Sequence, residues 1–127
     1  MHDPVEIVRA WHEAVNAGDT ERLADLVAND VEIGGPHGST YGLAVLIDWV
    51  GRTGIQMQPT DWYQRGETII VCQRATWRSE DGEPGVPQNV GSVFIVRDNR
   101  IGSILRYADL SGAFAATGLS ETDRVSG

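Results

Sequence analysis

The stretch that decides the fold is residues 89–109, NVGSVFIVRDNRIGSILRYAD. Asp98-Asn99 stands inside it, and a dipeptide of this type is typical of the tight turn in a β-hairpin. Strand-forming residues lie on both sides of the turn. The stretch therefore predicts two antiparallel strands, Asn89 to Arg97 and Ile101 to Asp109.

The segments before this hairpin change from helical to strand-like periodicity. Residues 4–17, 19–27 and 43–50 place apolar side chains at helical spacing. Met57 to Arg65 and Thr68 to Arg78 then have the composition of strands. Helices followed by a run of antiparallel strands predict an α+β fold, in which the helices pack on one face of a curved sheet.

The length of 127 residues suits one domain with one hydrophobic core. We therefore assign residues 1–127 to a single domain. Residues 113–117 are predicted to form a short helix, and the polar residues 118–127 are predicted to form a flexible tail.

Charge and residue usage exclude several classes of function. The chain has 18 acidic side chains, ten Arg and no Lys, which gives a formal net charge of −8. This acidity disfavours nucleic acids and anionic membranes as partners, and the lack of Lys excludes Schiff-base chemistry. The single Cys72 cannot form an intramolecular disulfide, and no apolar run is long enough to span a membrane, so we expect a cytoplasmic protein.

Strand pleating brings several polar side chains to one face of the predicted sheet. Cys72, Arg74 and Thr76 share a face of one strand, and Tyr107 and Asp109 share a face of the last strand. If the helices cover this face, a carboxylate and a guanidinium lie together in a semi-enclosed apolar pocket. A carboxylic acid in such a pocket is a usable acid or base near neutral pH, because desolvation disfavours its charged form. The alternative is that Arg74 and Asp109 form a structural ion pair.

Two segments resemble the SnoaL-like group of the nuclear-transport-factor-2-like superfamily. Residues 14–30, AVNAGDTERLADLVAND, are similar to the helix-turn-helix opening of that group. Residues 93–109, VFIVRDNRIGSILRYAD, resemble its closing hairpin. The resemblance implies a cone-shaped fold, in which a strongly curved mixed or antiparallel sheet wraps around a pocket and the N-terminal helices cover it.

Two of the enzyme types that share this fold fit the sequence poorly. The positions that carry the chemistry of ketosteroid isomerases correspond here to Gly35, Trp11 and Ser92, none of which has the required group. Limonene-epoxide-hydrolase-like enzymes use an Asp-Arg-Asp set with a Tyr and an Asn that position water. Thr76 replaces the second Asp, and Ile33 and Gly35 replace the Tyr and the Asn. Epoxide hydrolysis is therefore the weakest of the enzyme hypotheses that we keep.

A SnoaL-like polyketide cyclase requires fewer groups. The resemblance implies one Asp that acts as acid and base in an intramolecular aldol closure, and Asp109 matches it, with Arg74 as its electrostatic partner. The residues predicted to bind substrate are Trp11, Phe94, Tyr107, His37, Thr76 and Cys72. The sequence thus favours a cofactor-free cyclase or isomerase that acts on an apolar, carbonyl-bearing substrate, without a metal site. It leaves the orientations of His12, Trp49 and Trp62 open.

A different class of function shares the same fold. A non-catalytic module would use the same pocket to hold a small apolar ligand, or would bind a partner protein. The fold alone does not separate this alternative from the enzyme.

The sheet face opposite the predicted site is also apolar. A solvated face would not carry so many apolar side chains, so we predict a homodimer in which a second copy covers it. The residues of this predicted interface are Ile69, Val71, Ala75, Trp77, Val93 and Ile95.

Overall fold

Helix α1 (Pro4–Ala17) forms where the sequence predicts it. The Asp3 carboxylate accepts a hydrogen bond from the backbone N–H of Val5 at 3.0 Å, which satisfies a free donor of the first turn. The helix ends at Gly18, whose φ of 67° lies in the left-handed region that favours glycine. Helix α2 (Thr20–Leu26) follows almost at once.

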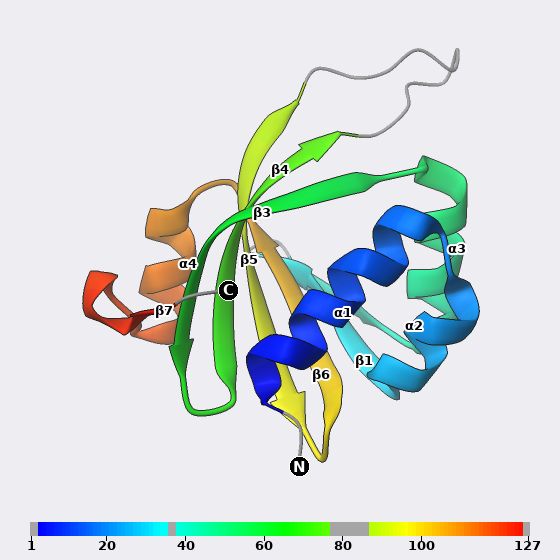
Figure 1. The fold of residues 1–127 in the computed structure, drawn as a ribbon, viewed down its shortest axis with the longest axis horizontal. Helices are drawn as coiled ribbons and strands as arrows, with labels where there is room; N and C mark the ends of the chain where they lie inside the picture. Colours follow the sequence, from blue (N-terminus) through cyan, green and yellow to red (C-terminus); the bar gives the residue numbers. More distant parts are fainter. Residues whose placement is uncertain (1–2, 36–37, 77–86, 126–127) are drawn as a thin grey trace.

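A single mixed sheet forms the centre of the molecule (Figure 1). The computed structural model describes residues 3–35, 38–76 and 87–125. Within these ranges the strand order is β2-β1-β6-β5-β4-β3-β7, and β1 and β6 pair in parallel while the other neighbours are antiparallel. The strands are β1 (Val27–Gly35), β2 (Gly38–Tyr41), β3 (Gln56–Arg65), β4 (Thr68–Thr76), β5 (Gln88–Arg97), β6 (Arg100–Tyr107) and β7 (Arg124–Val125).

The hairpin between β5 and β6 is confirmed. Asp98 and Asn99 have φ values of 52° and 64°, so both residues of the turn adopt the left-handed conformation that a tight hairpin requires. The two strands pair in antiparallel register from Arg97 opposite Arg100 to Gly91 opposite Tyr107.

Helices cover both faces of the sheet (Figure 1). Helices α1, α2 and α3 (Leu43–Thr53) lie on one side, and α4 (Leu110–Thr117) lies on the other. The larger core forms under α1, where Trp11 and Val71 are buried. A smaller core forms under α4, around Ile70 and Val93. The α+β fold with a curved mixed sheet and the N-terminal helices on one face is therefore confirmed.

The expectation about which sheet face the N-terminal helices cover is wrong. Val71 and Gln73 of β4 point toward α1 and are buried, whereas Cys72 lies on the α4 side and Arg74 is exposed. The pleat alternates as predicted, but both faces of β4 carry apolar residues, so the pattern alone does not say which face is turned inward. Helix α4 covers the second face, and its short sequence gave no strong signal of that role.

The predicted dimer interface is also affected by this reversal. Ile69, Val71 and Ala75 belong to the core under α1, whereas Val93 belongs to the core under α4. These side chains therefore do not form one outer face, and Trp77 lies outside the described residues. The homodimer itself stays a prediction, which light scattering in solution would test.

The polar end of the chain, predicted to be flexible, contains regular structure. Glu121–Asp123 form a 3₁₀ turn that begins with a reciprocal capping box between Ser120 and Asp123. Strand β7 then pairs with β3, and Arg65 holds Asp123 in an ion pair at 2.8 Å. Within the described residues, none of the helices is long and apolar enough to cross a membrane.

Candidate ligand pocket

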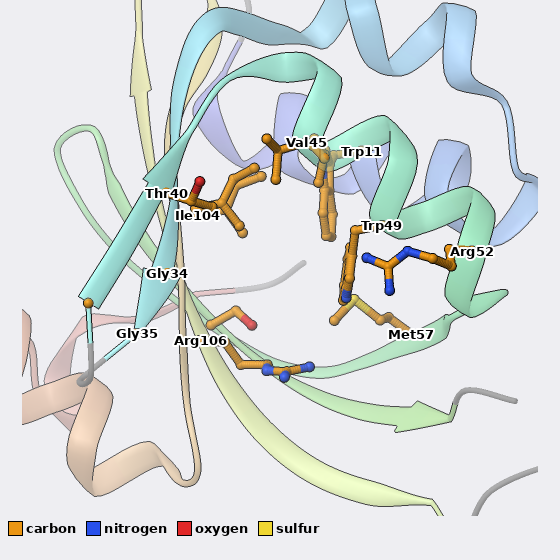
Figure 2. A pocket seen from close by; sticks show the side chains of 14 residues that line it. Trp11, Gly34, Gly35, Thr40, Val45, Trp49, Arg52, Met57, Ile104 and Arg106 are labelled. Carbon is orange, nitrogen blue, oxygen red and sulfur yellow. The ribbon is translucent and has the colours of Figure 1, made fainter. Parts of the chain in front are cut away.

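A pocket of about 420 Å³ lies between α1, α3 and the sheet (Figure 2). Trp11 of α1 and Trp49 of α3 contribute aromatic surface, and Met57 of β3 and Ile104 of β6 contribute apolar surface. The volume falls within the range of small-molecule sites, which are mostly apolar with a few polar groups. This composition suits a flat apolar ligand.

Two glycines allow the strands that border the pocket to approach closely. A Cβ atom on Gly34 would lie 2.3 Å from the carbonyl oxygen of Gly38, and one on Gly35 would lie 2.5 Å from that of Arg106. Real side chains are not found at such distances, so these positions require glycine. The glycines therefore serve the packing of β1 against β2 and β6.

The charged groups of the described lining are two arginines. Arg52 of α3 and Arg106 of β6 line the pocket, and Figure 2 shows both on its Trp49 and Met57 side. The Nε of Arg52 donates to the Asp48 carboxylate at 3.2 Å, in an exposed ion pair along the helix. Water screens such a pair, so it offsets only part of the positive charge. The pocket thus presents cationic groups beside aromatic rings.

A buried chain of hydrogen bonds extends from α1 to the pocket. His12 Nδ1 donates to the Val8 carbonyl oxygen at 2.8 Å, and Gln73 Nε2 donates to His12 Nε2 at 2.7 Å. Ser92 Oγ donates to Gln73 Oε1 at 2.6 Å. His12, Gln73 and Ser92 are each at most 2% exposed, and Ser92 also lines the pocket.

Burial keeps His12 neutral. It lowers the pKa of the imidazole from 6.5 to about 4, and the hydrogen bond to Val8 offsets only part of this effect. Trp11 is packed against the same region, with its ring 4.9 Å from that of Phe94. Among the buried side-chain nitrogen and oxygen atoms of the described residues, Trp11 Nε1 is the one without a hydrogen-bond partner.

The sequence also matches a known protein family. Residues 8–104 match the SnoaL-like domain. The chain belongs to the SnoaL-like domain family. This match confirms the resemblance on which the sequence-based hypotheses rest. No curated protein matches this SnoaL-like domain in sequence.

Solved structures show the same fold at low sequence identity. An NTF2-like protein of unknown function from Cytophaga hutchinsonii has a TM-score of 0.74 at 12% identity, over 90% of this chain and 96% of its own. A Sinorhizobium meliloti protein, provisionally named a polyketide cyclase, has a TM-score of 0.69 at 18% identity. The match covers 84% of this chain and 100% of the other. The epoxide hydrolase/cyclase-like enzyme SalBIII, described in pyran ring formation in polyether salinomycin, has a TM-score of 0.74 at 18% identity. The match covers 86% of this chain and 92% of the other.

The two residues predicted to be catalytic do not line this pocket. Asp109 is exposed and caps α4, where its Oδ1 accepts the backbone N–H of Gly112 at 2.9 Å. Arg74 is exposed and lies with Thr76 beside a separate hollow, near Asn16. Arg74 occupies an exposed position in the alternating pleat of β4, whereas Asp109 lies beyond the end of β6, where it begins α4. Their catalytic role stays a prediction.

The remaining predicted site residues are divided between the two sides of the sheet. Trp11 lines the pocket, and Phe94 is fully buried behind it. Tyr107 and Cys72 pack against the core under α4, and burial raises the pKa of the Cys72 thiol. His37 lies outside the described residues.

The side chains whose orientation the sequence left open are now placed. Trp49 lines the pocket, whereas Trp62 belongs to the core under α1, with the Arg9 guanidinium 5.9 Å from its ring centre. His12 points toward the sheet. No group of three metal-ligating side chains is found among residues 3–35, 38–76 and 87–125.

Sequence reasoning missed the two arginines and the buried chain. Arg106 and Tyr107 are adjacent on β6, and successive side chains of a strand point to opposite faces. Arg106 therefore faces the pocket, whereas Tyr107 packs against the core under α4. Gln73 carried a usable signal, since it is a polar residue in the apolar series of Ile69, Val71 and Ala75. A buried amide needs partners, and His12 and Ser92 provide them.

Proposed function

We propose that this SnoaL-like domain binds a flat, apolar small molecule that carries an anionic or carbonyl oxygen. The observation that carries the proposal is the combination of Trp11 and Trp49 with Arg52 and Arg106 around one pocket. Aromatic rings favour a planar ligand, and guanidinium groups recognise oxygen anions.

Calorimetric titration with 2-naphthoate tests this function, because the probe combines a flat bicyclic ring with a carboxylate. We expect saturable binding to one site that is tighter than binding of the neutral 2-naphthamide. Arg52→Gln and Arg106→Gln should each weaken 2-naphthoate about two- to fivefold, as expected for partly solvated charge pairs. Trp49→Ala should weaken both probes.

The matched control is Arg22→Gln, since Arg22 is exposed on α2 and is not part of the pocket lining. It changes the net charge in the same way and should leave the dissociation constant unchanged. Equal losses from Arg22→Gln and from the pocket variants would argue against the pocket as the binding site.

Enolisation of a bound ketone is the second candidate function, and the two guanidinium groups favour it. An enolate carries negative charge on oxygen, and fixed cations near that oxygen lower the barrier to its formation. The same intermediate serves the cyclase or isomerase chemistry that the sequence predicts. Family membership supports this chemistry without specifying a substrate.

The enolisation hypothesis is tested by exchange of the C1 protons of 2-tetralone in D₂O, followed by NMR. Exchange releases a proton from carbon to the solvent and returns a deuteron to the same carbon. We expect acceleration over buffer and a loss of that acceleration in Arg106→Gln. A loss in Asp109→Asn would instead support the base predicted from the sequence. Rates equal to those of buffer would rule out catalysed enolisation of this ketone.

A further inference from the structure

Ser92 occupies a position that couples the buried interior to the pocket. It lies on β5, opposite Val71 of β4 and Arg106 of β6 in the strand register. Its side chain is buried, lines the pocket and donates its hydroxyl proton to Gln73. The direction of that hydrogen bond decides what the hydroxyl offers to a ligand.

The direction of each hydrogen bond in this series is set at its Val8 end. The Val8 carbonyl oxygen can only accept, so His12 Nδ1 must carry the proton. In the neutral imidazole the other nitrogen, Nε2, is then an acceptor, and the Gln73 amide must turn its N–H toward it. The amide oxygen of Gln73 therefore faces Ser92, which has to donate.

We propose that Ser92 is a specificity-determining residue of the pocket, because the chain from Val8 through His12 and Gln73 commits its proton and leaves only lone pairs for a ligand. The inference rests on the proposed binding function and specifies the ligand further. A ligand that donates a hydrogen bond at this position, such as a phenol or an enol, is preferred over one that only accepts. His12 and Gln73 are positioning residues in this scheme, since they act through Ser92.

Trp11 lines the same pocket and carries a second buried polar group. Its indole Nε1–H has no partner within the described residues, and a buried donor without a partner carries a free-energy cost. That nitrogen is enclosed by the protein, so it is not counted among the groups that a ligand contacts. The polar preference of the pocket wall is therefore assigned to Ser92, whose remaining lone pairs match the hydroxyl of a hydroxylated aromatic compound.

The test compares 2-naphthol with 2-methoxynaphthalene, which differ in the ability to donate a hydrogen bond. We expect calorimetry to show that the intact protein prefers 2-naphthol by about three- to tenfold, the effect of one neutral hydrogen bond. Ser92→Ala should abolish this preference. A preference caused only by the larger methoxy group would persist in Ser92→Ala and would overturn the proposal.

Variants at His12 separate positioning from simple packing. Gln at position 12 can still accept a hydrogen bond from Gln73, whereas Leu cannot. We expect His12→Gln to retain the preference for 2-naphthol and His12→Leu to lose it. Equal preferences in the two variants would overturn the positioning role.

The unmodified protein provides a readout that does not depend on any variant. Nitrogen-15 shifts of the histidine ring should show His12 as the neutral tautomer with its proton on Nδ1. The opposite tautomer would reverse the donors and acceptors in the hydrogen bonds from His12 to Ser92 and contradict the proposal.

Failure of this inference is distinguishable from failure of the proposed function. If both naphthalene probes bind equally well and Trp49→Ala weakens both, the pocket binds ligands and the role of Ser92 is refuted. If neither these probes nor 2-naphthoate binds, the binding function and the role of Ser92 fail together.

Discussion

His12 is a titratable group placed where its charged form is not solvated. Burial lowers its pKa from 6.5 to about 4, so the unfolded chain binds a proton at this residue over a pH range in which the folded chain does not. The free energy of unfolding should therefore be largest above pH 6.5 and should fall as the pH decreases toward 4. We expect a loss of about 2 kcal/mol from this group between pH 7 and pH 5.

Urea unfolding of the intact protein and of His12→Gln at the two pH values measures this contribution. The variant keeps His2 and His37, so the difference between the two pH dependences belongs to residue 12. Parallel pH dependences would show that His12 titrates alike in the folded and unfolded states.

At the scale of elements, the close contact between β1 and β6 depends on Gly35. A Cβ there would lie 2.5 Å from the Arg106 carbonyl oxygen, so Gly35→Ala should destabilise the fold by about 1–3 kcal/mol through overpacking. Gly51 is the matched control, because it lies in α3 with open space around its Cα. Gly51→Ala should stabilise by about 0.5–1 kcal/mol, through helix propensity. Thermal unfolding of both variants should give shifts of opposite sign.

Helix α4 provides a second prediction at this scale, because it begins at the Asp109 cap. Asp109→Asn keeps an acceptor for the Gly112 N–H and should change stability by only a few tenths of a kcal/mol. Asp109→Ala removes the acceptor and should cost about 1 kcal/mol. Both variants should bind 2-naphthoate as the parent does, and a large loss in Asp109→Asn would show that the carboxylate takes part in recognition.

The elements themselves could largely be predicted from the sequence, because their signals are local. The helix over residues 4–17 and the Asp98-Asn99 turn depend on neighbouring residues, and both are confirmed. The inward face of β4 could not be predicted in this way. Ile69 and Ile70 are both fully buried, since helices cover both faces, so apolar alternation gives the two faces the same appearance.

The site depends on contacts across the whole molecule, and for that reason less of it could be predicted. Trp11 is found in the pocket as expected, but Arg52 and Arg106 are 54 positions apart in the numbering and come together only through the crossing of α3 over the sheet. The link between His12 and Gln73 spans a separation of 61 residues. Local periodicity contains no information about such pairs.

Ligand binding should raise the stability of the whole domain. A ligand that binds the folded chain alone stabilises it by mass action, by about 2.7 kcal/mol at one hundred times its dissociation constant. For a domain of this size the expected rise in Tm is on the order of 10 °C. A thermal scan with 2-naphthoate measures it, and Arg22→Gln should show the same rise. No rise at saturating concentration would contradict binding to the native state.

The buried chain from Val8 to Ser92 also bears on how the preferences of related domains diverge in evolution. A substitution at position 12 changes which partner Gln73 can satisfy, and through it the polarity that Ser92 presents, while the pocket lining keeps its composition. Two descendants with identical pocket walls would then accept different ligands. Comparisons of ligand preference within the family should therefore align these interior residues together with the residues of the cavity surface.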